Sequence, residues 1–336
     1  MARFILGHGM RGLGARNTRV ERVLYRLDRL FFGALLWLIR LLPVDLASRF
    51  GAAVGRTFGP RFRKSRALDE NLRIALPHAT PLERKRIARE AWANAGAVFA
   101  EYGHLDTIIP ADSGRMECVV HGDIETLRNP ARPAIFVGAH QANWEMMGAA
   151  ITRFGVPLAA LFSPPTNPLL DEMLRHWRSG LGCEMLTRDE SMRPMIRALT
   201  HGSSLGIVAD RRVDSGKPVA LFGIDKPTSL IPARLALRFG YDLVPVRTER
   251  LHGARFRVSF YPPIRPPAAA AAADEIEQAI RMTHEIHSLF EQWILERPGE
   301  WFCSKRLWPK EAYGGSRTRN DGARCLISAS TLRYSP

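Results

Sequence analysis

Short apolar runs alternate with amphipathic segments along the chain from about residue 116. Strands are predicted where an apolar run lies between turn residues, over residues 116–120, 134–137, 157–162, 183–186, 204–209, 242–248 and 255–261. Helices are predicted where apolar residues recur every three or four positions, over residues 143–153, 168–180, 190–200, 228–239 and 274–296. Because strands and helices alternate, the pattern predicts an α/β fold in which helices cover a mainly parallel central sheet.

The pattern before residue 116 is helical. Helices are predicted over residues 45–56, 65–75 and 81–102, and a more apolar one runs from Leu30 to Leu42 before Pro43. Thirteen residues of helix reach about 20 Å, which is less than the ~30 Å hydrocarbon core of a bilayer. We therefore expect residues 30–43 to form an N-terminal membrane-anchoring helix that lies in the interface or barely spans it. A buried core helix is the alternative.

Composition divides the chain into four parts. Residues 1–29 carry seven Arg and are expected to form a flexible basic arm. The helix over 30–43 follows, and residues 44–310 form one domain. Residues 311–336 are rich in Gly, Ser, Arg and Asn without periodicity, so we expect a disordered tail.

The formal net charge of +15 indicates an anionic partner. No nucleic-acid-binding motif accompanies the charge, so a membrane phospholipid surface or an acidic substrate is favoured and no nucleic acid is expected. The four cysteines, Cys118, Cys183, Cys303 and Cys325, have no metal-ligand spacing. We expect reduced thiols, no metal and no cofactor.

The strongest chemical signal follows the predicted strand at residues 134–137. A tight turn leads from this strand into a helix that is expected to open near Asn143, a good N-cap residue. The carboxyl end of the strand then carries His140, with Glu145 one helical turn inside. Because an imidazole near a carboxylate can take a proton from a hydroxyl at neutral pH, we predict that His140 and Glu145 are catalytic.

The same spacing occurs at His78 and Glu83, where the context is structural. Thr80 is placed to cap a helix, Pro81 takes its first position, and Glu83 completes a capping box. The surrounding elements therefore distinguish the two matches.

Gly202-Ser-Ser204-Leu-Gly206 matches the nucleophile elbow of serine hydrolases. That elbow requires a strand before the serine and a helix after it. Here a helix precedes and a strand follows, so we interpret Ser204 as part of a helix-to-strand turn.

Asp210 ends the strand predicted at 204–209. If that strand is parallel to the strand before His140, both side chains lie at the same edge of the sheet. Asp210 is therefore a candidate for catalytic support. The structural alternative is a salt bridge to Arg211 or Arg212.

Three further residues are candidates for substrate binding. Asn167 precedes a helix and is expected to cap it first and to contact a ligand second. Arg175 and Arg178 lie on that helix, where they could bind a phosphate or pair with Asp210.

Ordered landmarks over residues 24–310 resemble the late acyltransferases of lipid A biosynthesis, the lauroyl/myristoyl-transferase family. They are the N-terminal hydrophobic helix, Asn71-Leu72 with Pro77, Glu101, Gly138–Glu145, Asn167–Asp171, Asp210, Leu221–Gly223, Thr228 before Pro232-Ala-Arg-Leu-Ala, Arg297–Phe302, and Lys305-Arg306. The resemblance implies a glycerolipid-acyltransferase-like domain over 44–310. It implies transfer of a fatty acyl chain from acyl carrier protein to a hydroxyl of a lipid A precursor. The implied location is the cytoplasmic face of the inner membrane of a Gram-negative bacterium. The base of the family's H-x-x-x-x-D/E motif maps onto His140, and its acid maps onto Glu145.

The chain departs from the family pattern at two places. Phe162-Ser163-Pro164 stands where the family commonly has Tyr-Arg-Pro, so an Arg is absent unless Arg175 or Arg178 replaces it. Cys303-Ser304 replaces larger residues. The alternatives are a glycerophospholipid or lysophospholipid acyltransferase and a catalytically impaired membrane-binding homologue.

The expected mechanism is direct transfer. His140 deprotonates the acceptor hydroxyl, and either Glu145 or Asp210 orients the imidazole. Backbone N–H groups at the start of the helix near Asn143 are candidates for stabilising the oxyanion. No Ser or Cys is placed to form an acyl-enzyme.

Overall fold

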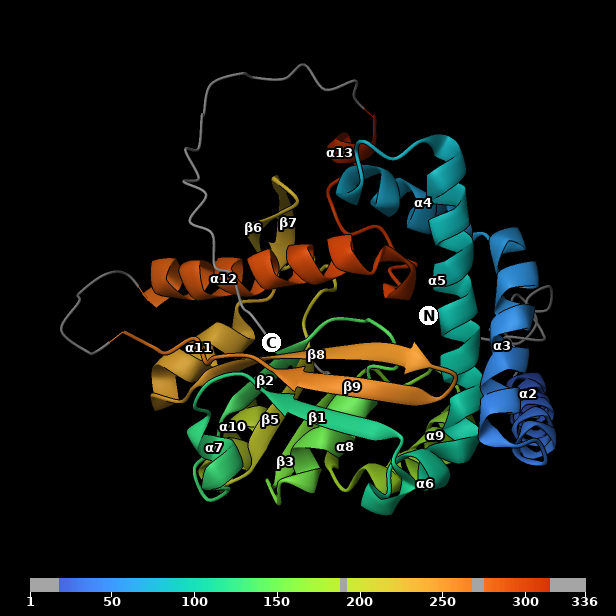
Figure 1. Cartoon of the computed structure of the whole chain (residues 1–336), viewed down its shortest axis with the longest axis horizontal. Coiled ribbons are helices and arrows are strands. Elements are labelled where there is room, and N and C mark those ends of the chain that lie inside the picture. Colours follow the sequence, from blue (N-terminus) through green and yellow to red (C-terminus); the bar gives the residue numbers. More distant parts are fainter. Residues whose placement is uncertain (1–17, 188–191, 268–274, 315–336) are drawn as a thin grey trace.

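A seven-stranded sheet lies at the centre of the computed structural model, which describes residues 18–187, 192–267 and 275–314 (Figure 1). The strand order is β1-β9-β8-β2-β5-β3-β4. The strands are β1 Met116–Val120, β2 Ile135–Gly138, β3 Leu158–Phe162, β4 Glu184–Thr187, β5 Ser204–Val208, β8 Leu243–His252 and β9 Arg255–Phe260. Neighbouring strands are parallel except for β8 and β9, which form an antiparallel hairpin. The predicted α/β fold with a mainly parallel sheet is confirmed.

Helices cover both faces of the sheet. The helices after β1 are α7 Glu125–Arg128, α8 Met146–Arg153, α9 Pro168–Arg178, α10 Arg193–Thr200, α11 Ile231–Phe239 and α12 Glu275–Glu296. Alternate side chains of a strand point to opposite faces, so Phe136 packs in the core that includes α8. Ile135 and Val137 pack in the core that includes α10, α11 and α12. Both faces of β2 are therefore apolar, as expected for a parallel strand.

The N-terminal helices are α2 Thr18–Arg40, α3 Val44–Phe58, α4 Lys64–Ala75 and α5 Pro81–Glu101, followed by the short α6 Leu105–Ile108. Figure 1 shows α5 between α3 and the sheet. Glycines let α3 and α5 approach closely, because a Cβ on Gly55 would lie 2.1 Å from the carbonyl oxygen of Trp92. Phe32 of α2 packs edge-on against Phe99 of α5, with 5.9 Å between the ring centroids.

The expected bounds of the first helix were wrong. The helix begins at Thr18 and ends at Arg40, so residues 18–29 belong to it and not to a flexible arm. Its apolar stripe continues toward the N-terminus at Val23 and Leu27. Residues 1–17 lie outside the described residues. Among the described helices, none combines the length and apolar character needed to cross a membrane.

Two further boundaries differ from expectation. The helix expected at 228–239 begins at Ile231, because β6 Lys217–Leu221 and β7 Ile224–Thr228 form an antiparallel hairpin before it. The turn of this hairpin places Phe222 and Gly223 at φ values of 53° and 68°. Positive φ at both central residues belongs to a type I′ turn, but Phe is an unusual residue there, so the hairpin was not predicted from the sequence.

The chain is ordered beyond residue 310, where the tail was expected to begin. Glu311–Gly314 forms the short helix α13, and Tyr313 donates a hydrogen bond to Asn71 Oδ1 at 2.6 Å. Residues 311–314 therefore belong to the folded domain, since their contacts tie them to α4. The rest of the expected tail, residues 315–336, lies outside the described residues.

Two structural interpretations of sequence motifs are confirmed. Glu83 accepts a hydrogen bond from the backbone N–H of Thr80 at 2.7 Å, and its own N–H donates to Thr80 Oγ1 at 3.3 Å, which completes the capping box. Ser204 lies where the chain enters β5 after α10. Its hydroxyl is buried and accepts a hydrogen bond from the N–H of Ala134.

Candidate active site

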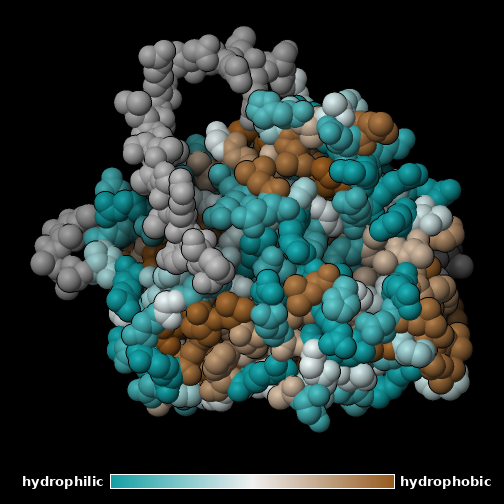
Figure 2. All heavy atoms as spheres, in the orientation of Figure 1, coloured by the Kyte–Doolittle hydropathy of each residue, from teal (hydrophilic) through white to brown (hydrophobic). Residues whose placement is uncertain are grey.

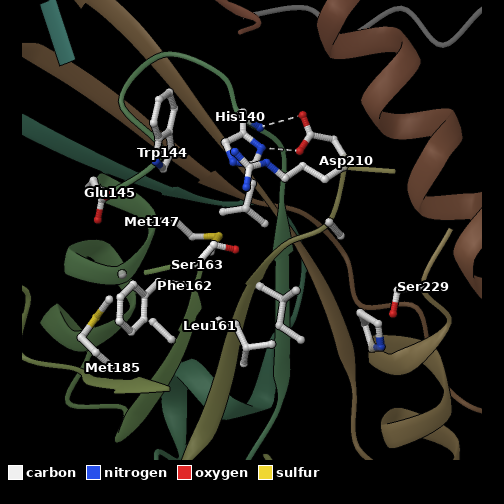
Figure 3. Close-up of a pocket in the computed structure, with 18 of the residues that line it drawn as sticks. His140, Trp144, Glu145, Met147, Leu161, Phe162, Ser163, Met185, Asp210 and Ser229 are labelled. Carbon is white, nitrogen blue, oxygen red and sulfur yellow. Dashed lines mark hydrogen bonds and ion pairs between the residues drawn. The ribbon is translucent and has the colours of Figure 1, made fainter. Parts of the chain in front are cut away.

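His140 and Asp210 form a hydrogen-bonded pair at the carboxyl edge of the sheet. Gly138 ends β2 and lies opposite Val208, which ends the parallel neighbour β5. His140 and Asp210 each follow the end of their strand by two residues, so both lie at the same edge of the sheet. Nδ1 of His140 lies 2.5 Å from Oδ1 of Asp210, and the backbone N–H of His140 donates to Oδ2 at 3.1 Å (Figure 3).

The surroundings of Asp210 keep its carboxylate ionised. Burial raises the pKa of Asp210, but the His140 imidazole and backbone N–H, with the indole of Trp301, outweigh burial and hold it well below its usual value. Trp301 Nε1 donates to Oδ2 at 3.0 Å, and the buried ammonium of Lys226 donates to the Asp210 carbonyl oxygen at 3.0 Å. Because a carboxylate can only accept, it holds the proton on Nδ1 and leaves Nε2 as the basic nitrogen.

Glu145 is paired with another residue of the site. Arg178 donates from Nη2 to Oε1 at 2.6 Å and from Nε to Oε2 at 3.0 Å, and the hydroxyl of Tyr102 also donates to Oε1. Burial lowers the pKa of Arg178, but Glu145 and Tyr102 outweigh it and raise that pKa above its usual value. Figure 3 places Glu145 and Asp210 on opposite sides of His140. Of the two acids considered at the sequence level, Asp210 is the one that contacts the imidazole.

The alternative partners considered for the charged candidates were wrong. Arg178 pairs with Glu145, and Arg175 pairs with Asp171 at 3.0 Å, so neither pairs with Asp210. The guanidinium of Arg175 also lies 4.4 Å from the ring centroid of Phe162. The alternative salt bridge from Asp210 to Arg211 or Arg212 does not form either, because the Asp210 carboxylate pairs with His140 and Arg212 pairs with Asp214.

Asn167 caps α9 as predicted. Its Oδ1 accepts a hydrogen bond from the N–H of Leu169 at 3.0 Å, and its Nδ2 donates to the carbonyl oxygen of Tyr25 at 3.0 Å. Oδ1 therefore caps α9, and Nδ2 joins this helix to α2. Asn167 is 3% exposed, which leaves it little surface for a ligand.

A cavity of about 370 Å³ opens beside His140, and residues of β3, β4 and β5 line part of it. One part of its wall is apolar and includes Met147, Leu158, Met185 and Gly206. Gly206 widens this part, because a Cβ there would already contact Leu158 at 3.5 Å and Met147 at 3.7 Å. We call it the apolar arm. Met147 and Met185 lie on the same side of His140 in Figure 3.

The model for bacterial lipid A biosynthesis acyltransferases matches residues 16–310 of the chain. The chain belongs to this family. The acyltransferase therefore is an enzyme that transfers acyl groups, and lipid A biosynthesis is the setting of its family.

Two individual proteins are similar to this acyltransferase. The lipid A biosynthesis acyltransferase of Haemophilus influenzae is 22% identical over 273 residues, which are 78% of this chain and 84% of the relative. The solved structure of the 1-acyl-sn-glycerophosphate acyltransferase from Thermotoga maritima is 16% identical. It covers 75% of this chain and 95% of its own, with a TM-score of 0.36.

The loop that carries His140 in the acyltransferase is fixed by a buried polar network. Glu101 is fully buried and accepts a hydrogen bond from Asn143 Nδ2 at 2.9 Å and one from Ser48 Oγ at 2.6 Å. Arg250 neutralises this carboxylate. Glu101 is one of the landmarks in the sequence, but its partners lie 53 and 149 residues away. Their pairing becomes visible only in the folded chain.

The segment around residues 300–302 also holds the loop that carries His140. The N–H of Phe302 donates to the carbonyl oxygen of His140 at 2.9 Å, and the N–H of Ala142 donates to Glu300 at 3.0 Å. Ala142 has a φ of 44°, which an L-residue adopts at a cost of about 1–3 kcal/mol. These bonds keep the turn in place and set Trp301 against Asp210. Trp301 lies within a landmark of the sequence, but its contact with Asp210 was not predicted.

The expected oxyanion donors are used by the turn itself. Helix α8 begins at Met146, not near Asn143. The N–H of Glu145 donates to Asn143 Oδ1 at 3.2 Å, and the N–H of Met146 donates to the Asn143 carbonyl at 3.0 Å. Asn143 therefore accepts hydrogen bonds from two of the N–H groups that were expected to face an oxyanion.

Proposed function

We propose that this acyltransferase moves a fatty acyl chain from acyl carrier protein to a hydroxyl of a lipid A precursor, with His140 as the general base. The observation that carries the proposal is the His140–Asp210 pair, whose basic Nε2 is available beside a cavity with an apolar arm. An apolar arm suits a fatty acyl chain, because each buried CH₂ group contributes about 0.8 kcal/mol. Membership of the family supports a lipid A precursor as the acceptor.

In the proposed reaction, Nε2 of His140 takes the proton of the acceptor hydroxyl while its oxygen attacks the thioester carbonyl. The new C–O bond forms and the C–S bond of the thioester breaks. The imidazolium then returns its proton to the departing thiolate of the carrier arm. Asp210 stabilises the imidazolium between these two transfers and keeps Nδ1 protonated throughout.

Direct transfer is favoured over an acyl-enzyme. Burial raises the pKa of the Cys183 thiol to about 11, and burial also raises the pKa of Cys303 far above its usual value. Both thiols are therefore protonated at neutral pH and are poor nucleophiles. Ser204 is buried at the start of β5, at the opposite end of this strand from Asp210.

We further propose that helices α2 and α3 lie on the cytoplasmic face of the inner membrane. Large apolar side chains are exposed along one stripe of each helix, with Leu41 just after α2. They are Leu30, Trp37 and Leu38 on α2 and Leu46, Phe50, Val54 and Phe58 on α3. Figure 2 shows hydrophobic surface over these two helices. Arg residues flank both stripes, which suits an anionic phospholipid surface.

The acceptor and donor are tested with purified enzyme. We expect acyl transfer from acyl carrier protein thioester to a lipid A precursor and much slower transfer to glycerol 3-phosphate or lysophospholipid. Faster transfer to either glycerolipid would favour a glycerophospholipid acyltransferase. Vesicle binding without transfer to any acceptor would favour an impaired homologue.

Membrane binding is tested with vesicles that contain anionic phospholipid. Leu30→Glu should weaken sedimentation with vesicles by about 10-fold or more, since it removes an apolar side chain from the surface and adds a negative charge. Leu82→Glu is the control, because Leu82 is also exposed but lies at the start of α5. Equal binding of both variants would refute the proposed surface.

A further inference from the structure

Two cations at the cavity are left without a carboxylate partner. Arg211 directly follows Asp210, Lys64 begins α4, and both side chains line the cavity that contains His140. They lie 147 positions apart in the sequence, so the fold brings them to one cavity. Over the described ranges, no ion pair joins either cation to an acidic side chain.

The acids that line the same cavity already have partners. Glu145 is held by Arg178, and Asp210 is held by His140. Arg212, the neighbour of Arg211, shows how a structural arginine is engaged in this region. It pairs with Asp214 at 2.5 Å and donates to the carbonyl oxygen of Trp308 at 2.6 Å. The cavity therefore has an excess of positive charge, which an anionic group on a bound substrate would balance.

We propose that Lys64 and Arg211 form a subsite for a phosphate monoester carried by the acyl acceptor. Arg and Lys are the usual phosphate-binding side chains, and Arg can donate two parallel hydrogen bonds to one phosphate. The inference rests on the proposed function, because it names a group of the acceptor in that reaction. It makes these two residues binding residues of the acyltransferase.

The position of Arg211 favours the acceptor over the donor as the source of the phosphate. Its Cα lies about 3.8 Å from that of Asp210, whose carboxylate contacts the base. An anion held there is close to the reacting hydroxyl. In an acyl carrier protein thioester, the phosphodiester stands at the opposite end of the pantetheine arm from the sulfur. A donor bound with its thioester at His140 therefore keeps its phosphate away from Arg211.

The subsite is tested by binding, independently of turnover. Titration calorimetry compares a short-chain glucosamine disaccharide that carries a phosphate monoester with the same compound after phosphatase treatment. Wild-type enzyme should bind the phosphorylated probe about 10- to 100-fold more tightly, which is the range for hydrogen bonds to a charged group. Arg211→Gln and Lys64→Gln should each lose most of this preference, and Arg211→Lys should keep part of it.

Arg63→Gln is the matched control. Arg63 is exposed and precedes Lys64, but it does not line the cavity, so the variant loses the same charge and should keep the preference. Thermal melting of each variant checks that it is folded. Equal binding of both probes by wild type, or an unchanged preference in the two Gln variants, would overturn the proposal.

Acyl transfer separates this inference from the proposed function. Both Gln variants should raise KM for the phosphorylated acceptor with a smaller change in kcat. If wild type instead prefers an acyl-phosphopantetheine donor to an acyl-pantetheine donor and the Gln variants lose that preference, the subsite belongs to the donor and the proposal is wrong. Phosphate-dependent binding without acyl transfer would leave the subsite intact and refute the proposed function.

Discussion

Glu145 and Arg178 form a buried ion pair with two hydrogen bonds, 2.6 Å and 3.0 Å long. Glu145 lies on the side of His140 away from Asp210 (Figure 3). The side chains are 8% and 12% exposed. The pair joins the loop before α8 to α9, since Glu145 directly precedes α8 and Arg178 ends α9. Glu145, the acid of the H-x-x-x-x-E motif, therefore stabilises the wall of the cavity. Asp210, which follows β5, contacts the proposed base His140.

Removal of Glu145 should destabilise the protein. Glu145→Ala leaves the guanidinium of Arg178 buried without its partner, which costs about 3–5 kcal/mol. Urea denaturation measures the change in the free energy of unfolding. Replacing both partners, as in Glu145→Leu with Arg178→Met, should recover much of the loss, because no charge is then left buried.

The exposed pair Glu117–Arg257 provides the comparison. Glu117→Ala should cost about 1 kcal/mol or less, as is usual for surface ion pairs. If Glu145→Ala were no more destabilising than Glu117→Ala, the Glu145–Arg178 pair would not have the structural role assigned to it.

Trp301 should act on the reaction through Asp210. Trp301→Phe keeps a large aromatic ring at a fully buried position but removes the N–H that donates to the carboxylate. We expect kcat to fall by about 10-fold, the cost of one hydrogen bond to a charged group, with KM nearly unchanged. Steady-state kinetics with acyl carrier protein thioester measures both constants.

Trp308→Phe is the matched variant, because Trp308 is also fully buried but donates to the carbonyl oxygen of Leu221. It should lose stability without the same loss of kcat. An equal fall in kcat for the two variants would mean that Trp301 supports the fold and not the orientation of Asp210.

His287 should make stability depend on pH. Burial, with the nearby charge of Lys226, lowers the pKa of His287 from 6.5 to about 3 in the folded protein. Between these two values the unfolded chain binds the proton more readily than the folded chain, so the free energy of unfolding falls as the pH decreases. From pH 6.5 to pH 5 this loss amounts to about 2 kcal/mol.

Urea titrations at several pH values test this slope. His287→Asn should flatten it, whereas His284→Asn should not, because His284 is exposed on the same helix. An unchanged slope in His287→Asn would show that His287 does not cause the pH dependence.

Gly206 should set how deep an acyl chain reaches into the apolar arm. A leucine at this position would fill the space between Leu158 and Met147. Gly206→Leu should therefore shift the preferred donor to shorter acyl chains, measured with a series of carrier-protein thioesters of increasing length. Each CH₂ group that loses its site should weaken transition-state binding by about 0.8 kcal/mol, which is about 4-fold in kcat/KM.

Gly180→Ala provides a control at a glycine outside the cavity, where an added Cβ would meet Ile109 at 3.9 Å. It should leave the chain-length profile unchanged. The same profile in Gly206→Leu and wild type would place the acyl chain elsewhere in the protein.

The features that depend on local sequence pattern, the strands and the residues at their ends, were predicted correctly. Apolar runs located the strands, and strand ends placed His140 and Asp210 at one edge, because parallel strands share their carboxyl ends. Which of the two acids, Glu145 or Asp210, contacts the imidazole of His140 could be decided only from the folded structure. Sequence spacing put Glu145 inside a helix, but helix α8 begins at Met146, and Glu145 lies in the turn before it, where its N–H donates to Asn143 Oδ1.

Most of the features that were not predicted are contacts between segments far apart in the sequence. The link from Trp301 to Asp210 spans 91 residues, and the pair between Glu101 and Arg250 spans 149. The chain has 48 Lys and Arg residues with 33 Asp and Glu residues, so local pattern does not determine which of them pair. The β6–β7 hairpin was missed for a local reason, the positive φ of Phe222.

The role of His140 as the base is the central claim, and acyl transfer by His140→Ala tests it most directly. Purified wild type and variant are incubated with acyl carrier protein thioester and lipid A precursor, after equal thermal melting has shown that both are folded. Loss of a general base should slow transfer by about 10²- to 10⁴-fold. Transfer by His140→Ala at the wild-type rate would contradict this role of His140.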